Sequence, residues 1–102
     1  MSVLHTINKS PFSFTILKSF VSVCGMNDGL LLLEDGVFGA LDNAITNDEQ
    51  LILKQKNIKI YALSTDVIAR GIEKKISKHI TLISYDDFVQ LTLEHQNVHS
   101  WF

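Results

Sequence analysis

The stretch NDGLLLLEDG, residues 27–36, decides the fold class of this chain. Four consecutive leucines, residues 30–33, lie between two groups of turn-forming residues. A short, unbroken apolar run with turns on both sides is typical of a β-strand that is covered on both faces, as the strands of parallel sheets are. We therefore predict a central strand over residues 30–33.

Strand signals alternate with helix signals on both sides of this run. Short runs rich in apolar and β-branched residues predict further strands over residues 2–7, 59–63 and 80–83. Parallel strands need long crossover connections, which helices usually supply. The pattern predicts an α/β fold, with a mainly parallel sheet in a three-layer α/β/α arrangement, and a single domain that spans residues 1–102.

The first helix is predicted between residues 10 and 24. Ser10 is a suitable N-cap, and Pro11 fits the first helical position, where a missing N–H does no harm. The expected apolar face consists of Ile16, Leu17, Phe20, Val21 and Cys24. Gly25 then suits a left-handed helix stop.

The middle of the chain carries weaker signals. Residues 37–41 fit one helical turn, and residues 48–56 fit a helix that starts at Asn47. Residues 41–57 are accordingly the least determined part of the fold.

Two further helices are predicted in the second half. Ser64 or Thr65 caps a short helix through residue 70, which Gly71 ends. Ser84 or Asp86 caps the last helix, and a tail follows it. Four residues are predicted to share one face of that last helix: Phe88, Leu91, Thr92 and His95.

Composition limits the classes of function. The chain has 102 residues, 46% of them hydrophobic, and a net charge of -2, which offers no general attraction to nucleic acid or to an anionic membrane. Direct nucleic-acid binding is therefore not expected. The chain has a single cysteine, no signal-peptide pattern, and no apolar run long enough to span a bilayer. We expect a cytoplasmic protein.

Cys24 is the only thiol, and two roles for it stay open. A reactive cysteine needs a lowered pKa, which a helix N-terminus or a cationic neighbour supplies. Cys24 is expected at the opposite end of its helix and on the core face. A packing role is therefore favoured over a role as a nucleophile.

The histidines carry no convincing metal signal. His95 and His99 have the four-residue spacing that places two ligands on one helix face, but they lack the glutamate of a zinc protease. No metal site and no cofactor are predicted. His5 lies inside the first strand, where a hydrogen-bonded structural role is favoured over a role as a general base.

Three other residues are candidates for contact with a partner. Asp35 precedes Gly36 and either caps the next segment or meets a neighbouring subunit. Arg70 opens a basic group with Lys74, Lys75 and Lys78 that suits either solvent or an acidic partner. Trp101 is followed by Phe102, and both must be buried on the chain's own core or in an interface. His5, Asp35, Arg70 and Trp101 are thus the predicted interface residues, and no catalytic constellation is evident.

Four blocks of the chain together resemble one known family. They are LHTINKSP (residues 4–11), LLLLEDGV (30–37), IYALSTDVIARG (60–71) and ISYDDFVQLTLEHQNVHSW (83–101). Their order and content are similar to those of the TusB/DsrH family. The resemblance implies a DsrE/DsrF/DsrH-like fold and membership of a heterohexamer with two copies each of three related chains.

The resemblance also implies a function in sulfur transfer. The version formed by TusB, TusC and TusD relays sulfur as persulfide, from a TusA-like carrier to a TusE-like protein, toward 2-thiouridine at the tRNA wobble position. The Dsr version serves sulfur oxidation. Members of the DsrH type can carry a cysteine in the first helix, where this chain has Phe20, which favours the Tus version. We expect an accessory subunit that is not an enzyme on its own, with a sulfurtransferase subunit using Cys24 as an alternative.

Overall fold

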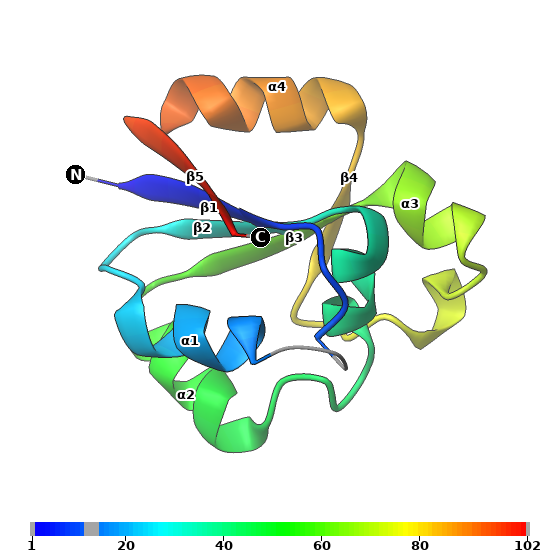
Figure 1. The fold of residues 1–102 in the computed structure, drawn as a ribbon, viewed down its shortest axis with the longest axis horizontal. Coiled ribbons are helices and arrows are strands. Elements are labelled where there is room, and N and C mark those ends of the chain that lie inside the picture. The colour runs from blue at the N-terminus through cyan, green and yellow to red at the C-terminus, as the bar shows by residue number, and fades with distance from the viewer. Residues whose placement is uncertain (1, 12–14, 102) are drawn as a thin grey trace.

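A five-stranded sheet with the order β4-β3-β2-β1-β5 forms the centre of the molecule (Figure 1). The computed structural model describes residues 2–11 and 15–101. The strands are β1 (Val3–Ile7), β2 (Gly29–Leu32), β3 (Lys59–Leu63), β4 (Thr81–Ile83) and β5 (Asn97–Trp101). All four pairs of neighbouring strands are parallel. The predicted parallel sheet is confirmed.

Helices cover both faces of this sheet (Figure 1). The α-helices are α1 (Ile16–Val23), α2 (Asn47–Gln55), α3 (Ser64–Ala69) and α4 (Tyr85–Glu94). Two 3-10 helices are η1 (Glu34–Ala40) and η2 (Glu73–Lys75). Helices α1 and α2 lie on one face and α4 on the other, whereas α3 and η1 lie beyond the carboxyl ends of the strands. The three-layer α/β/α prediction is therefore confirmed.

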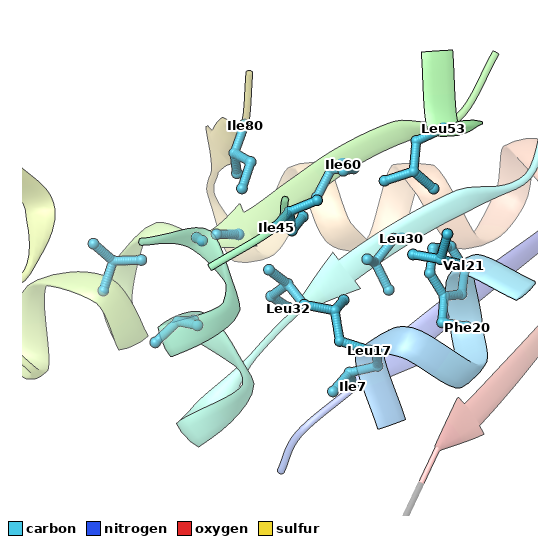
Figure 2. Packing of buried hydrophobic residues seen from close by; sticks show 14 of the residues in the cluster. Ile7, Leu17, Phe20, Val21, Leu30, Leu32, Ile45, Leu53, Ile60 and Ile80 are labelled. Atoms are coloured by element: carbon cyan, nitrogen blue, oxygen red, sulfur yellow. The ribbon is translucent and has the colours of Figure 1, made fainter. Parts of the chain in front are cut away.

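The leucine run shows why the sheet needs both helical layers. Leu30 and Leu32 belong to a large core cluster under α1 and α2, which Figure 2 shows from close by. Leu31 belongs to a smaller cluster with Leu4, Ile83 and Leu91 under α4. Since successive side chains of a strand point to opposite faces, an unbroken apolar strand must be covered twice.

Helices α2 and α4 both begin with a capping box. Thr46 caps α2, and its hydroxyl oxygen accepts from the Glu49 N–H while the Glu49 carboxylate accepts from the Thr46 N–H. Ser84 and Asp87 make the equivalent pair of bonds at α4. This reciprocal arrangement satisfies donors that the first helical turn leaves free. The predicted helix near residues 48–56 is confirmed, and Ser84, not Asp86, caps α4.

The predicted ends of the first helix are wrong where the structure describes them. Pro11 lies in a turn, α1 begins at Ile16, and residues 12–14 lie outside the described residues. Gly25 does not adopt the left-handed conformation, because Cys24 already leaves the helix with an extended backbone. The left-handed residue is Asn27, with φ of 66°.

The segment around α3 matches its prediction at one end only. Helix α3 follows β3 directly, with Leu63 at the N-cap position and no side-chain capping bond, so neither Ser64 nor Thr65 acts as the cap. Gly71 does have a left-handed backbone, with φ of 65°, and ends the helix as predicted. The helical turn expected over residues 37–41 is η1, which begins earlier, at Glu34.

The C-terminal tail is a strand, which sequence analysis missed. Helix α4 ends at Glu94, and His95 leaves it with an extended backbone. The Gln96 N–H then donates to the Ser2 carbonyl, which brings the chain alongside β1. His99 therefore lies on β5, and the expectation that His95 and His99 share a helix face is wrong.

Candidate functional site

A buried polar network joins three distant parts of the chain. His5 lies on β1, and Asp28 directly precedes β2. The distance between His5 Nε2 and Asp28 Oδ2 is 2.8 Å, within hydrogen-bonding range. The Trp101 indole on β5 donates to His5 Nδ1 over 3.1 Å. Because an indole N–H only donates, Nδ1 must accept, which assigns the imidazole proton to Nε2. The network therefore fixes both the tautomer and the orientation of His5.

Asp28 organises the turn before β2. Besides His5, it accepts hydrogen bonds of 2.9 Å from the backbone N–H groups of Val3 and Gly25. Burial alone would raise the pKa of Asp28, but the hydrogen bonds from His5, Gly25 and Val3 outweigh burial and lower that pKa below its usual value. Asp28 is thus an ionised carboxylate, although only 6% of the residue is exposed.

Aromatic rings enclose the imidazole. The Phe20 ring from α1 lies edge-on to His5 with centroids 4.9 Å apart, and the His99 ring lies 5.8 Å away. An Asp–His pair orients an imidazole in many hydrolases, where the free ring nitrogen faces a nucleophile. Here Trp101 occupies that nitrogen. The arrangement therefore has the chemistry of a structural tie between β1, β5 and the turn at Asp28.

Cys24 is buried, as the sequence predicted, with 4% of the residue exposed. Its thiol lies 3.5 Å from the Val21 carbonyl oxygen. Lys56 Nζ donates to the Cys24 carbonyl oxygen over 2.9 Å and lies 3.9 Å from the Cys24 sulfur. Burial, reinforced by Asp28, raises the pKa of the Cys24 thiol despite the opposing charge of Lys56. The surroundings thus disfavour the thiolate that nucleophilic chemistry needs.

Two of the predicted interface residues form an exposed ion pair beyond the carboxyl ends of the strands. Arg70 donates from Nε and Nη2 to Asp35 Oδ1 over 3.1 and 2.9 Å. Next to this pair, the Glu34 N–H donates to the Asp66 carboxylate over 2.7 Å. A side chain on Gly36 would overlap the Ile7 carbonyl, so the chain's own backbone fills the space there.

The four predicted interface residues thus lie in two separate groups. His5 and Trp101 belong to the buried network, and Asp35 and Arg70 form the exposed pair. Asp28 was missed as a network member, since the sequence NDG indicates only a turn. Besides the nearby Gly25, the hydrogen-bond partners of Asp28 are His5 and Val3, which lie 23 and 25 residues away, beyond the reach of any local pattern.

The described residues show neither a metal cluster nor a membrane-spanning helix. Within residues 2–11 and 15–101, no group of three or more His, Cys, Asp or Glu side chains is arranged to hold a metal ion. Among the described helices, none is long and apolar enough to cross a membrane.

Comparison with known proteins identifies the family. The model of the DsrH-like protein family matches residues 9–98. This chain belongs to the DsrH-like family. Protein TusB of Escherichia coli strain K12 is 41% identical over 99 residues, which cover 97% of this chain and 100% of that protein. The match to DsrH-like proteins confirms the resemblance to the TusB/DsrH family that the four sequence blocks carry.

Solved structures agree on the fold of this DsrH-like chain. The ychN protein from E. coli superposes with a TM-score of 0.79 at 17% identity, covering 99% of each chain. MTH1491 from Methanobacterium thermoautotrophicum, a protein of unknown function, superposes with a TM-score of 0.73 at 13% identity, covering 98% of each chain. These structures share the parallel α/β architecture, which confirms the predicted DsrE/DsrF/DsrH-like fold.

Proposed function

We propose that residues 1–102 act as one TusB-like domain, an accessory subunit of a TusBCD-like heterohexamer in the cytoplasm. The complex would support persulfide transfer for 2-thiolation of the wobble uridine of tRNA. The similarity to TusB, 41% identity over 97% of this chain, supports a role of the TusB type in sulfur relay. The direct partners would be TusC-like and TusD-like chains, with TusA-like and TusE-like carriers acting through the assembled complex.

The proposal that this chain is an accessory subunit, and does not itself carry sulfur, depends on the burial and the raised pKa of Cys24. A persulfide relay needs an accessible thiolate that attacks the incoming sulfur. Cys24 is the only thiol of the chain, it is buried, and its pKa is raised. The chain would therefore contribute surface and position to the complex, while a cysteine on a partner carries the sulfur.

Native mass spectrometry of the tagged protein, purified from its own host, tests assembly and sulfur location together. We expect a six-chain complex in which the added sulfur is found on a partner's cysteine. Persulfide trapped on Cys24 in the assembled complex would instead favour a sulfurtransferase subunit.

Genetic deletion tests the pathway. Loss of the gene is expected to abolish 2-thiolation of the wobble uridine, measured by nucleoside mass spectrometry of total tRNA. A Cys24→Ser copy should restore thiolation, because the thiol is not used. Unchanged thiolation together with impaired sulfur oxidation would support the DsrH-like alternative.

The predicted contacts of His5, Asp35, Arg70 and Trp101 with other subunits belong to the same proposal. The Asp35–Arg70 pair is open to solvent and therefore accessible to a partner. His5 is buried within the chain, so its contribution to an interface would act through Trp101, to which it is hydrogen-bonded.

A further inference from the structure

His5 is a buried imidazole whose two nitrogens have opposite roles. Only 7% of the residue is exposed. Nε2 lies 2.8 Å from the Asp28 carboxylate, which is an acceptor, and Nδ1 lies 3.1 Å from the Trp101 indole nitrogen, which is a donor. A neutral imidazole has one N–H and one bare nitrogen, so it satisfies both neighbours at once. The surroundings of His5 therefore fit the neutral ring with its proton on Nε2.

A second proton on His5 is incompatible with this arrangement. Histidine is the side chain that usually changes charge between about pH 5 and 8. The added proton has to bind Nδ1, the nitrogen to which the Trp101 indole donates. Nδ1 then becomes a donor, and an indole has no acceptor with which to reverse its role, as a hydroxyl could. Protonation of His5 must therefore break its hydrogen bond with Trp101.

Asp28 gives the protonated ring a place in the folded chain. Its carboxylate is negatively charged and lies beside Nε2. A buried imidazolium with no anion next to it is costly, whereas one that is paired with a carboxylate and hydrogen-bonded to it is tolerated. Protonation thus strengthens the contact of His5 with Asp28 and ends its contact with Trp101.

Other ionisable groups near His5 come from several elements of the described chain. His99 of β5 is paired in register with His5, and the two ring centroids are 5.8 Å apart. On the helical side, Cys24 follows α1, and Lys56, which follows α2, has its Nζ 3.9 Å from the Cys24 sulfur. Burial raises the pKa of the Cys24 thiol, so this thiol stays neutral where imidazoles change charge. His99 is the neighbour that titrates in the same range, and it needs its own control.

Trp101 fixes the carboxyl end of β5. This strand lies at the edge of the sheet and pairs with β1 (Figure 1). Just before its amino end, a backbone hydrogen bond to the Ser2 carbonyl holds the chain. At its carboxyl end, Trp101 donates to His5 and packs against the large core cluster, and the Thr6 hydroxyl donates to Ser100 over 3.2 Å. Loss of the His5 bond therefore loosens the carboxyl end of β5 first.

We propose that His5 is a proton-controlled latch: the neutral ring holds Trp101 and the carboxyl end of β5, and protonation of the ring releases them. The hydrogen bond between His5 and Asp28 stays in place in both states. The latch lies within this chain, so the inference goes beyond the proposed function and does not depend on it. Release exposes the part of the core that the indole covers.

Fluorescence of the 102-residue chain measures the release directly, because Trp101 is its only tryptophan. Between about pH 8 and pH 5, the emission maximum should move to longer wavelength as the indole enters water. Far-UV circular dichroism of the same samples should stay unchanged, since the release is local. A loss of the helix signal with the same midpoint would mean global unfolding and would overturn the latch.

Matched substitutions of the two neighbouring histidines assign the transition. His5→Gln removes the titrating ring and keeps a polar side chain, so the fluorescence shift should be lost. His99→Gln removes the imidazole that lies 5.2 Å from the Trp101 ring, and the shift should remain. The opposite result, with the shift kept in His5→Gln and lost in His99→Gln, would assign the titration to His99 and overturn the inference.

Nuclear magnetic resonance of the nitrogen-labelled, unaltered chain tests the latch without any substitution. At about pH 8, the His5 ring should carry its proton on Nε2. As His5 binds its second proton, the indole N–H resonance of Trp101 should move toward its position in the unfolded chain, with the same midpoint. A proton on Nδ1 at high pH, or an indole resonance that does not follow the titration of His5, would overturn the inference.

The same linkage must act in the opposite direction. The indole bond forms only with the neutral ring, so it opposes protonation of His5. Trp101→Phe should therefore raise the pH at which His5 is half protonated, by roughly 0.5–1 unit, the equivalent of one ordinary hydrogen bond. Val98→Ala, also on β5, is the control and should leave this midpoint unchanged. An unchanged midpoint in Trp101→Phe would overturn the latch, because the bond would then favour neither protonation state.

Discussion

The two faces of the sheet differ in how completely their apolar side chains are buried. Under α1 and α2, the core includes Phe20 and Leu30, neither of which has any exposed surface. Under α4, the buried cluster is small, and Leu93 is 74% exposed on the same helix. Burial of apolar area is the main stabilising term in folding, so the first face holds the chain together. The second face contributes less to the core, and apolar side chains of α4 stay exposed on it.

Truncation of Phe20 should give the largest effect and test the first face. Phe20→Ala leaves a cavity in a closely packed core and should lower the free energy of unfolding by about 3–5 kcal/mol. Urea denaturation followed by circular dichroism measures the loss. Leu93→Ala is the control on the second face and should change the value by less than about 0.5 kcal/mol. Equal losses would remove the contrast between the faces.

Substitution of Asp28 tests how much its hydrogen bonds, which join the turn before β2 to β1, stabilise the fold. Asp28→Asn replaces an oxygen acceptor by an N–H donor, which leaves a donor such as the Val3 N–H unpaired. The expected cost is about 1–3 kcal/mol in the free energy of unfolding. Asp42→Asn, at an exposed position, is the control and should cost less than about 0.5 kcal/mol.

The same variant gives a pH test with a definite sign. The pKa of Asp28 is lowered in the folded chain, so its stabilisation is present above the unfolded pKa of about 3.9 and is lost as pH falls through the folded pKa. Denaturation at a series of pH values should show the advantage over Asp28→Asn at pH 6 and its loss below about pH 4. A difference independent of pH would assign the effect to shape alone.

Substitution of Trp101 tests the tie between β1 and the edge strand β5. Trp101→Phe keeps an aromatic ring but removes the indole N–H that donates to His5, at an expected cost of about 1 kcal/mol. In a chain that already carries His5→Phe, the same change should cost less, since the acceptor is gone. An equal cost in both backgrounds would mean that packing, and not the hydrogen bond, holds Trp101.

The smallest effect is expected outside both faces, at the exposed pair of Arg70 and Asp35. Arg70→Ala should lower the free energy of unfolding by about 0.2–1 kcal/mol, because solvent screens such pairs. A double-mutant cycle with Asp35→Ala, at low and high salt, isolates the pair from the Arg70 bond to the Asp66 carbonyl. A coupling that does not change with salt would contradict this expectation.

Local patterns predicted four of the strands and the buried side of α4 well and the C-terminal tail poorly. The leucine run, the segment at residues 59–63 and the core face with Phe88 and Leu91 follow from periodicity, and the structure confirms them. Strand β5 was missed because its sequence, NVHSW, is largely exposed and shows no apolar alternation. Its conformation depends on pairing with β1 more than 90 residues away.

The candidate site shows the same division. The sequence singled out His5, Asp35, Arg70, Trp101 and Cys24 by residue type and place in the chain. It could not pair them, because the side chains that meet come from segments 23 to 96 residues apart. Neither Asp28 nor the exposed Tyr85, Val89 and Leu93 of α4 were distinguishable from ordinary turn and helix residues before the packing was known.

The sequence by itself determined the α/β class, four of the strands, the burial of Cys24 and, through its four blocks, the family. These features depend on residue spacing over a few turns and on residue type. Only the tertiary structure decided the strand order, the place of β5, the tie between His5, Asp28 and Trp101, and the side of α4 that stays exposed. The physical reason is that burial and hydrogen-bond partners are properties of segments brought together in space, which no local pattern encodes.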